Sequence, residues 1–364
     1  MIPPLREVLQ ARWPELRPHH PPLTSAIVAG VDRSPAAKVT LVFFDWAGDL
    51  AAIAKVARSP ASEPALLREH EVLRYLWGLD VPSVREQVPE PLLLERVAGR
   101  LALVQAPLRG GPMTAAYYTP GHVADPALVA KDFTQAGAWL REFQRQTATG
   151  PKLLDAALSE EWIGQVIRAY RKEVGWTATE ERLFDEVMAN ANGLLGLSLP
   201  TAAVHGDYWM GNLLVDRSGL RGVIDWERGR SSGPCLLDVY KFPTSYALYM
   251  DRGYPGGVVP GHDGRDRWRE RWRRFGEWPH LVGFGYAYYG EGWFPDQVRD
   301  FVLGHLAALG IPAAANAVFF PLFLAEQALL PGHPRTRAAN RALLHAFAEE
   351  PGHTWLRSPD GQSR

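Results

Sequence analysis

The segment that decides the fold is VHGDYWMGNLLVD at residues 204–216, followed by VIDWE at residues 223–227. Its pattern is H-x-D-x-x-x-x-N, then two short apolar runs around a turn, then an Asp that closes an apolar strand. The apolar runs, at 213–215 and 222–224, predict a small β-hairpin. An Asp and an Asn therefore precede the hairpin, and a second Asp directly follows it.

Phosphoryl transfer requires polar side chains of this kind. One carboxylate must orient the attacking hydroxyl and accept its proton, while an Asn oxygen and a second carboxylate hold the Mg²⁺ that neutralises the ATP phosphates. Asp207 fits the first role, and Asn212 and Asp225 fit the second. The structural alternative makes His205 and Asp207 a buried turn pair and Asp225 a cap at the end of a strand.

The chain before this segment is rich in short strands. Runs of Val, Ile, Leu and Ala separated by turn residues predict antiparallel hairpins. These runs lie at 24–28, 39–45, 51–57, 90–95 and 101–106. One helix is expected at 62–77, with Ser62 as its N-cap and Leu side chains at helical spacing along one face.

The chain after residue 125 is mostly helical. Helices are expected at 126–146, 160–173 and 180–195, the last with Thr179 as N-cap, and the chain from 238 to about 348 is helical and aromatic. The tail, 357–364, is expected to be disordered. The fold class is therefore α+β. A strand-rich lobe at residues 1–105 precedes a larger helical lobe at residues 106–364, with a ligand cleft between them.

The segment resembles the catalytic loop of the aminoglycoside phosphotransferase and choline kinase group, small-molecule relatives of the protein kinases. The likeness extends to GPCLLD at 233–238, where that group has a Gly-Pro turn and an Asp that braces the loop. It covers roughly residues 24–240 and is sharpest at 204–238. The resemblance implies a protein-kinase-like two-lobe fold, ATP (or GTP) and Mg²⁺ as cofactors, and His205 and Asp238 as structural support.

The resemblance also implies a phosphate-binding lysine in the first lobe. Lys55 lies in the strand IAKVA at 53–57, where the group has this lysine. The lysine needs a carboxylate partner on the following helix, where Glu69 and Glu71 are both available. At 100° per residue Glu69 shares a face with the Leu side chains while Glu71 points nearly opposite, so Glu69 is the inward candidate.

Two further nucleotide contacts are expected from position alone. The loop at 30–36 should cover the phosphates, where Ser34 or backbone N–H groups are the candidate contacts. It lacks the G-x-G-x-x-G of protein kinases. Gln105 and Ala106 begin the segment that should link the lobes and present backbone groups to the nucleotide base.

A small acceptor is favoured over a protein acceptor. The HGD triplet at 205–207 lacks the Arg that pairs with an activation-loop phosphate in protein kinases. Asp238 follows Asp225 by only 13 positions, which leaves no room for a long activation segment. DWE at 225–227 also replaces the Asp-Phe-Gly of protein kinases.

The acceptor pocket is expected from the aromatic part of the helical lobe beyond residue 238, together with Trp209, Trp226 and Glu227. Aromatic rings stack on sugars or hold cationic amines, although most of these rings are core by default. The segment 265–274 holds six Arg and two Trp at helical spacing. It is either a surface helix with its Trp pair packed on the lobe, or a basic helix for anionic membrane or a phosphorylated acceptor.

Composition excludes several other classes. Lys+Arg is 39 and Asp+Glu is 40 among 364 residues, so the net charge of -1 argues against a nucleic-acid binder. One cysteine, Cys235, cannot form an internal disulfide, so a cytoplasmic location is expected. No signal peptide is apparent, and the greasiest region, 306–325, is interrupted by Pro and Asn, so no stable membrane insertion is expected. The sequence leaves the oligomeric state open.

The leading hypothesis is an ATP-dependent phosphotransferase that acts on a hydroxyl of a small molecule: a sugar, an aminoglycoside-like or other natural product, or an amino alcohol. The Arg-rich segment offsets the acids of the helical lobe, which favours a sugar or natural-product hydroxyl slightly over a typical polycationic aminoglycoside. The alternative is a non-catalytic nucleotide-binding regulatory protein of the same fold. A third hypothesis is a protein kinase or an adenylyl-transferring variant.

Overall fold

A computed structural model describes residues 2–31, 38–253, 258–276, 279–330, 334–350 and 355–357. Its contacts divide the chain into two compact units. The first unit is Met1–Gly111 with Asn212–Ser231, and the second unit is Pro112–Gly211 with Ser232–Arg364. The predicted lobes each follow the chain in one piece, whereas these contacts assign the hairpin segment to the first unit, where Gly222 approaches the carbonyl oxygen of Gln87.

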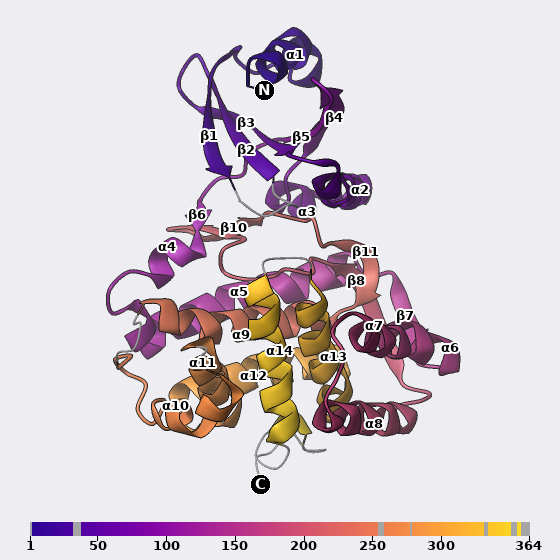
Figure 1. The fold of residues 1–364 in the computed structure, drawn as a ribbon. Coiled ribbons are helices and arrows are strands. Elements are labelled where there is room, and N and C mark those ends of the chain that lie inside the picture. Colours follow the sequence, from indigo (N-terminus) through magenta and orange to yellow (C-terminus); the bar gives the residue numbers. More distant parts are fainter. Residues whose placement is uncertain are drawn as a thin grey trace. The chain divides into compact units, whose positions relative to one another are not determined.

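The first unit is built on an antiparallel sheet of five strands in the order β1-β2-β3-β5-β4 (Figure 1). The strands are β1 (Leu23–Val31), β2 (Lys38–Asp45), β3 (Leu50–Ala57), β4 (Pro91–Val97) and β5 (Arg100–Gln105). The helices of this unit are α1 (Ile2–Leu16), η1 (Pro60–Ser62), α2 (Glu63–Gly78) and α3 (Pro82–Gln87). A short sheet, β10-β9-β6, is formed by β9 (Leu213–Asp216), β10 (Gly219–Val223) and β6 (Gly111–Pro112). The predicted strands, the α2 helix and the hairpin are confirmed.

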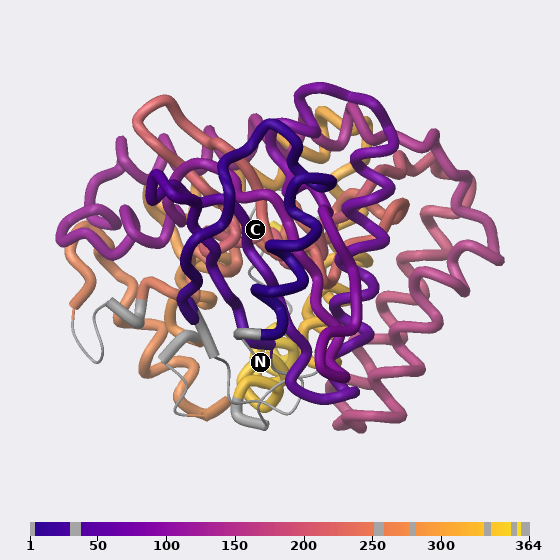
Figure 2. Tube along the Cα trace, turned by 90° about the horizontal axis from the view of Figure 1, so that it is seen from above, coloured from indigo at the N-terminus to yellow at the C-terminus, as the bar shows by residue number. Residues whose placement is uncertain are grey.

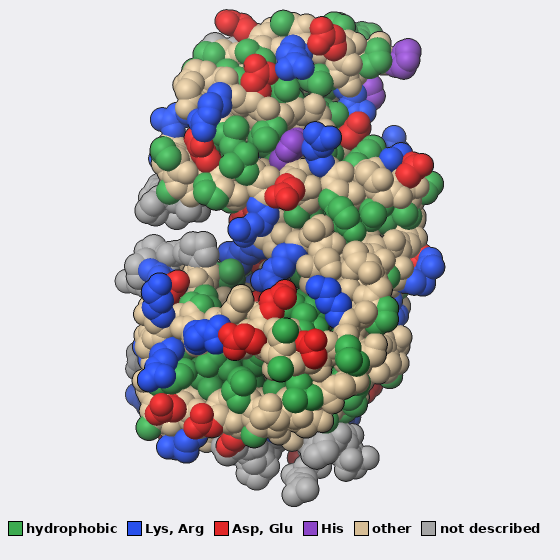
Figure 3. Space-filling view, turned by 90° about the vertical axis from the view of Figure 1, so that its right-hand side faces the viewer, with side chains coloured by type: hydrophobic (Ala, Val, Ile, Leu, Met, Phe, Trp, Pro, Cys, Tyr) green, Lys and Arg blue, Asp and Glu red, His purple; other side chains and the backbone are tan. Residues whose placement is uncertain are grey.

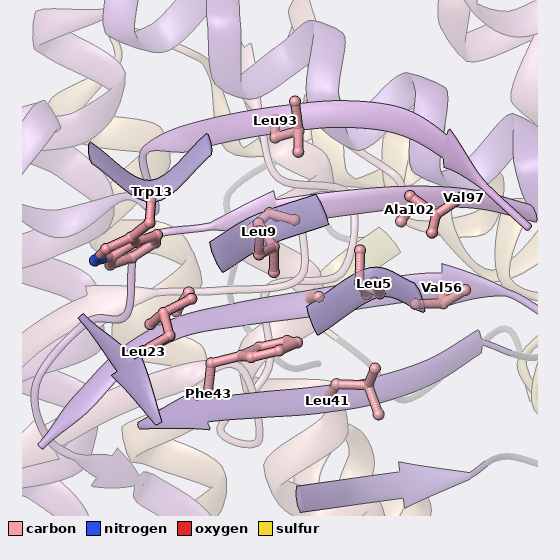
Figure 4. Packing of buried hydrophobic residues seen from close by; sticks show 13 residues of the cluster. Leu5, Leu9, Trp13, Leu23, Leu41, Phe43, Val56, Leu93, Val97 and Ala102 are labelled. Atoms are coloured by element: carbon pink, nitrogen blue, oxygen red, sulfur yellow. The ribbon is translucent and has the colours of Figure 1, made fainter. Parts of the chain in front are cut away.

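Helix α1 was not expected from the sequence, and it covers one face of the five-stranded sheet. Leu5, Leu9 and Trp13 project from it at four-residue spacing and pack on strand residues such as Leu41 and Phe43 (Figure 4). Figure 2 traces α1 lying over the strands of its unit. Because side chains alternate along a strand, the other face of the sheet is left for α2, where Leu66 joins Ala57, Leu101 and Leu103.

The second unit is mainly helical (Figure 1). Its helices are α4 (Met113–Tyr117), η2 (His122–Ala124), α5 (Pro126–Gln146), α6 (Ala156–Ser159), η3 (Glu160–Gly164), α7 (Gln165–Glu173), α8 (Ala178–Gly193), α9 (Leu236–Gly253), α10 (Arg267–Trp272), η4 (Arg273–Phe275), α11 (Pro279–Tyr289), α12 (Trp293–Ala308), η5 (Ala313–Ala315), α13 (Asn316–Leu329), α14 (Pro334–Glu349) and η6 (Trp355–Arg357). A sheet not expected from the sequence, β11-β8-β7, joins β7 (Gly150–Leu153), β8 (Ser198–Val204) and β11 (Arg230–Pro234). The α+β fold class is confirmed.

The structure bears on the expected N-cap of α8 and on the expected packing of the Arg-rich segment. The N-cap of α8 is Thr177 and not Thr179, because Thr177 Oγ1 accepts from Glu180 N while the Glu180 carboxylate accepts from Thr177 N in a reciprocal capping box. In the Arg-rich segment 265–274, Trp268 and Trp272 are buried with their rings edge to face, as expected for a surface helix packed on its own unit. Of the tail at 357–364, residues 358–364 lie outside the described residues.

Within the described parts of the chain no single helix is long and apolar enough to cross a membrane. The pair α12 and Ala313–Leu329 passes that test together, by length and composition, and is bent by 113°. On the face shown in Figure 3, Lys and Arg side chains are interspersed with Asp and Glu.

Helices α5 and α12 approach closely around a buried histidine. Gly137 of α5 has no Cβ, and one built there would lie 3.1 Å from both His305 and Phe301 of α12. The ring nitrogens of His305 face the carbonyl oxygens of Phe301 and Gly137 at 2.6 and 3.3 Å. Burial nevertheless lowers the pKa of His305 to about 4, so the folded protein holds a neutral imidazole where the unfolded chain is protonated below about pH 6.5.

We expect this histidine to make folding sensitive to acid. Its contribution to the free energy of unfolding is complete above pH 6.5 and is lost as the pH falls from 6.5 to about 4, by about 3 kcal/mol in total. Urea unfolding at pH 7.5 and at pH 4.5 measures this loss, and His305→Gln should reduce it. The matched control is His19→Gln, because His19 is exposed. An equal pH dependence in His305→Gln and the parent protein would disprove the assignment.

Candidate active site

The candidate site residues fall into two groups, one in each unit. The group in the first unit is the lysine–carboxylate cluster, which consists of Lys38, Lys55, Glu69, Asp225 and Glu227. Lys55 lies on β3 with its side chain on the same face of the sheet as α2, and Glu69 lies on α2. Asp225 and Glu227 follow strand β10. All five belong to the same unit, because the hairpin segment at 212–231 belongs to it.

Lys55 is at the centre of the lysine–carboxylate cluster. Its Nζ donates to Glu69 Oε1 at 2.5 Å and to Asp225 Oδ1 at 2.7 Å. Burial opposes the positive charge, but the carboxylates of Asp225 and Glu69 outweigh that cost and raise the pKa of Lys55 above its usual range. Lys55 is therefore a fixed ammonium group. Its hydrogen bond to Glu69 is the pairing that the sequence analysis expected.

Glu69 is completely buried. Its Oε1 also accepts from Gln105 Nε2 at 3.0 Å, so the amide of Gln105 supports the same carboxylate oxygen that Lys55 contacts. Sequence analysis expected backbone groups of Gln105 and Ala106 to face the nucleotide base, and this stays a prediction. The Gln105 side chain points to Glu69, and Ala106 N donates to Glu90 O at 2.9 Å. Ser34 lies outside the described residues.

Asp225 has a strained backbone. Its φ is +69°, in the left-handed region that non-glycine residues rarely adopt and that Asp tolerates better than most. Residues in such conformations persist where the surrounding structure holds them, often at functional sites. The backbone N–H of the preceding residue, Ile224, donates to Asn212 O at 3.0 Å, which ties the start and the end of the hairpin together. Asn212 and Asp225 are thus joined within one hairpin.

Lys38 is a cluster member that sequence analysis missed. It begins β2, and its Nζ donates to Glu227 Oε2 and lies 3.4 Å from Asp225 Oδ1. Glu227, predicted as an acceptor contact, is therefore paired with a lysine of its own unit. The other predicted acceptor residue here, Trp226, is completely buried and its Nε1 donates to Val223 O at 2.9 Å. The Trp226 side chain therefore has no exposed surface to offer an acceptor.

The side-chain oxygens of the hairpin segment at 212–231 are of the kind that binds a hard divalent cation. Asn212, Asp225 and Glu227 offer amide and carboxylate oxygens within one hairpin segment, and Mg²⁺ prefers such ligands. Among the described residues no group of three or more His, Cys, Asp and Glu side chains forms a metal site by itself. Mg²⁺ commonly takes one or two carboxylates and completes its coordination with substrate phosphates and water, and this donor set suits that mode.

The group in the second unit is the loop at 205–211, which follows β8. Asp238, in the first turn of α9, accepts the backbone N–H groups of His205 at 2.7 Å and Gly206 at 2.8 Å. Gly206 has a φ of +76°, which glycine adopts without strain. His205 is completely buried, and its Nδ1 accepts from Asp207 N at 3.2 Å. Asp238 and His205 therefore hold the loop backbone on both sides of Gly206.

Aromatic residues anchor the rest of this loop. Tyr208 OH donates to Ala136 O at 2.8 Å, and its ring stacks on Trp139 of α5 at 5.4 Å between centroids. Trp209 packs against Tyr249 of α9 at 4.9 Å and stays partly exposed. Asp207 directly precedes Tyr208 in this loop and is also partly exposed. Its Oδ1 lies 2.9 Å from Nζ of Lys241, a second lysine that sequence analysis missed.

The one cysteine of the chain, Cys235, is buried in the second unit. Burial raises the pKa of Cys235 to about 12, and its Sγ donates to Pro200 O at 3.4 Å. Because the thiolate is the reactive form, we expect no modification of the native protein by a disulfide reagent at pH 8 within the time that the urea-unfolded chain reacts fully. Rapid labelling of the native protein, followed by absorbance, would contradict this.

Comparison with known proteins identifies the family. The model of the phosphotransferase enzyme family (APH) matches residues 39–277, well over half of the chain. The chain belongs to this family. A search of curated proteins finds no match.

Comparison with solved structures supports the fold through one match. The apo form of a thermostable mutant of the aminoglycoside phosphotransferase APH(4)-Ia is similar at a TM-score of 0.52 and 13% identity, over 93% of this chain and 98% of that one. The macrolide 2'-phosphotransferase MphH from Brachybacterium faecium follows at a TM-score of 0.46 and 14% identity, over 94% of this chain and 99% of that one. Identities this low concern the fold alone, and the protein-kinase-like phosphotransferase fold is confirmed.

Proposed function

We propose that this protein transfers the γ-phosphoryl group of ATP to a hydroxyl group of a small molecule. The observation that carries the proposal is the lysine–carboxylate cluster. Its buried Lys55 is fixed by Glu69 and also donates to Asp225, the candidate ligand of the cation. Membership in the phosphotransferase family supports the class of reaction. Phosphoryl transfer depends on positioning and on charge stabilisation, and both need groups that are fixed before the substrate arrives.

Each site residue has its own proposed role in phosphoryl transfer. Lys55 binds nucleotide phosphate oxygens, and Glu69 orients Lys55. Asn212 and Asp225 would hold a divalent cation, which would supply positive charge against the nucleotide phosphates. Asp207 orients the acceptor hydroxyl and accepts its proton as the acceptor oxygen bonds to the γ-phosphorus. The bond from that phosphorus to the oxygen that bridges to the β-phosphate breaks, and ADP keeps this oxygen and its electron pair.

The acceptor is proposed to be small and bound beside the second unit. Trp209 is partly exposed next to Asp207 and supplies an aromatic surface for a sugar ring. The short path from Asp225 to α9, which includes β11, supports a small acceptor rather than a peptide. Lys241 beside Asp207 is unfavourable for a polycationic aminoglycoside at this point. We therefore propose a neutral sugar or natural-product hydroxyl.

A nucleotide-consumption screen tests the proposal. Purified protein with ATP and Mg²⁺ is assayed against aminoglycosides, macrolides, amino alcohols and sugars, with mass spectrometry of the product. We expect turnover with one class, and a loss of about 10²–10⁴-fold in Asp207→Asn, the usual contribution of a positioned general base. Asp185→Asn is the matched control, because Asp185 is exposed on α8. Full activity in Asp207→Asn would overturn the assignment, and ATP binding without turnover would favour a non-catalytic nucleotide-binding protein.

A further inference from the structure

Lys241 occupies a defined position beside the proposed base. It lies on α9, and its Nζ is 2.9 Å from Asp207 Oδ1 and donates to Gln327 Oε1 of α13 at 2.7 Å. The side chains of Lys241 and Asp207 are 16% and 19% exposed, so both are largely shielded from water. An ammonium group has three donors, and two of them have assigned acceptors here.

Helix α9 contacts both the backbone of the loop and the side chain of Asp207. Asp238 and Lys241 are three residues apart, and residues at this spacing lie on neighbouring positions of one helix face. Asp238 binds the backbone N–H groups of His205 and Gly206, and Lys241 binds the side chain of Asp207. The same helix face therefore fixes both the path of the loop and the carboxylate that the loop presents.

Helix α9 is itself fixed to α13. Gln327 of α13 accepts from Lys241, and Tyr240, the neighbour of Lys241 in α9, donates its hydroxyl to Asn316 Oδ1 at 2.8 Å. Tyr240 and Asn316 are both completely buried. The backbone of Lys241 is thus held by a packed helix, and its Nζ is held by Gln327. A fixed Nζ can orient the carboxylate of Asp207.

We propose that Lys241 is a positioning residue for phosphoryl transfer, which sets the rotation of the Asp207 carboxylate by holding its Oδ1. This inference rests on the proposed function. The direction of Oδ2 is then fixed relative to the loop, and with it the line along which an acceptor hydroxyl approaches. A reacting group displaced by about 1 Å can cost about a hundredfold in rate, so fixing this carboxylate matters for turnover.

A purely structural ion pair would behave differently. Ion pairs that keep some exposure contribute little to stability, so a pair that only braced the fold would leave the kcat of a folded variant nearly unchanged. A positioning residue acts through Asp207 alone. Its removal should therefore matter only when Asp207 is present.

Kinetics of single and double variants make this distinction. With the acceptor found in the screen, Lys241→Met should lower kcat by about 10–100-fold while the KM for ATP changes less than about twofold. Lys241→Arg keeps the charge and should recover most of kcat. In the Asp207→Asn background, Lys241→Met should lower kcat by less than about twofold, because the group that it positions is already lost. Lys172→Met is the matched control, since Lys172 is exposed on α7.

Two kinetic results would overturn the proposal: an unchanged kcat in Lys241→Met, or an equal loss in the presence and absence of the Asp207 carboxylate. An equal loss would mean that Lys241 contacts the transferred phosphoryl group directly or supports the fold. A readout that needs no turnover is the ¹⁵N resonance of the Lys241 ammonium group. It should shift in Asp207→Asn and stay in place in Asp185→Asn. No shift in Asp207→Asn would refute the contact even if the proposed function failed.

Discussion

Lys55→Met is expected to lower the free energy of unfolding by about 3–5 kcal/mol, the usual cost of removing one partner from a buried ion pair. The reason is Glu69, which is completely buried and keeps the Gln105 amide as a hydrogen-bond donor, but no cation, once the Lys55 ammonium group is gone. A buried carboxylate without its cation must either bear the cost of desolvation or take up a proton. Urea unfolding followed by Trp fluorescence measures the loss.

A second variant separates the charge imbalance from simple loss of packing. Lys55→Met combined with Glu69→Gln removes both charges, and it should regain most of the lost stability. Both variants should lack turnover, because neither has the ammonium group proposed to bind the nucleotide phosphates. The matched control is Lys172→Met. A Lys55→Met protein as stable as the parent would show that the buried carboxylate is not paired as the structure has it.

The sequence predicted those parts of the site whose signals are local. Periodicity in α2 separates Glu69 from Glu71, because one face of a helix is apolar, and Glu69 is indeed the buried partner of Lys55. Alternation in β3 puts Lys55 on the face of the sheet where α2 packs. Asp238 braces the loop as the resemblance implied. Whether these residues carry the reaction stays a prediction.

The missed residues have partners far away in the sequence. Lys38 contacts Glu227 across 189 positions, and nothing near Lys38 in the chain signals that pairing. Lys241 follows Asp238 by three positions, so the helical spacing was visible, but its contact with Asp207 depends on how the loop folds. Helix α1 was not expected from the sequence, although Pro is tolerated in a first turn and Leu5, Leu9 and Trp13 recur every four residues.

Asp238→Ala is expected to damage both folding and turnover. Asp238 is 1% exposed, and each carboxylate oxygen accepts one backbone N–H, from His205 and from Gly206. Losing the acceptor of a buried donor costs about 1–3 kcal/mol, and this applies in full to the buried His205 N–H and in part to the half-buried Gly206 N–H, so the free energy of unfolding should fall by at least about 1–3 kcal/mol. The loop would also lose the constraint that places Asp207, and we expect kcat to fall by at least about tenfold.

Asp238→Asn is the sharper variant because it keeps the shape of the side chain. Its amide has one oxygen and one NH₂ group, so one of the two backbone N–H groups would face a donor instead of an acceptor. We therefore expect Asp238→Asn to lose nearly as much stability as Asp238→Ala. If only the shape of the side chain mattered, Asp238→Asn would lose much less. Urea unfolding and steady-state kinetics of the two variants, with Asp185→Asn and Asp185→Ala as exposed controls, measure it. If Asp238→Asn matched the parent protein in both assays, the carboxylate would not be the brace of the loop.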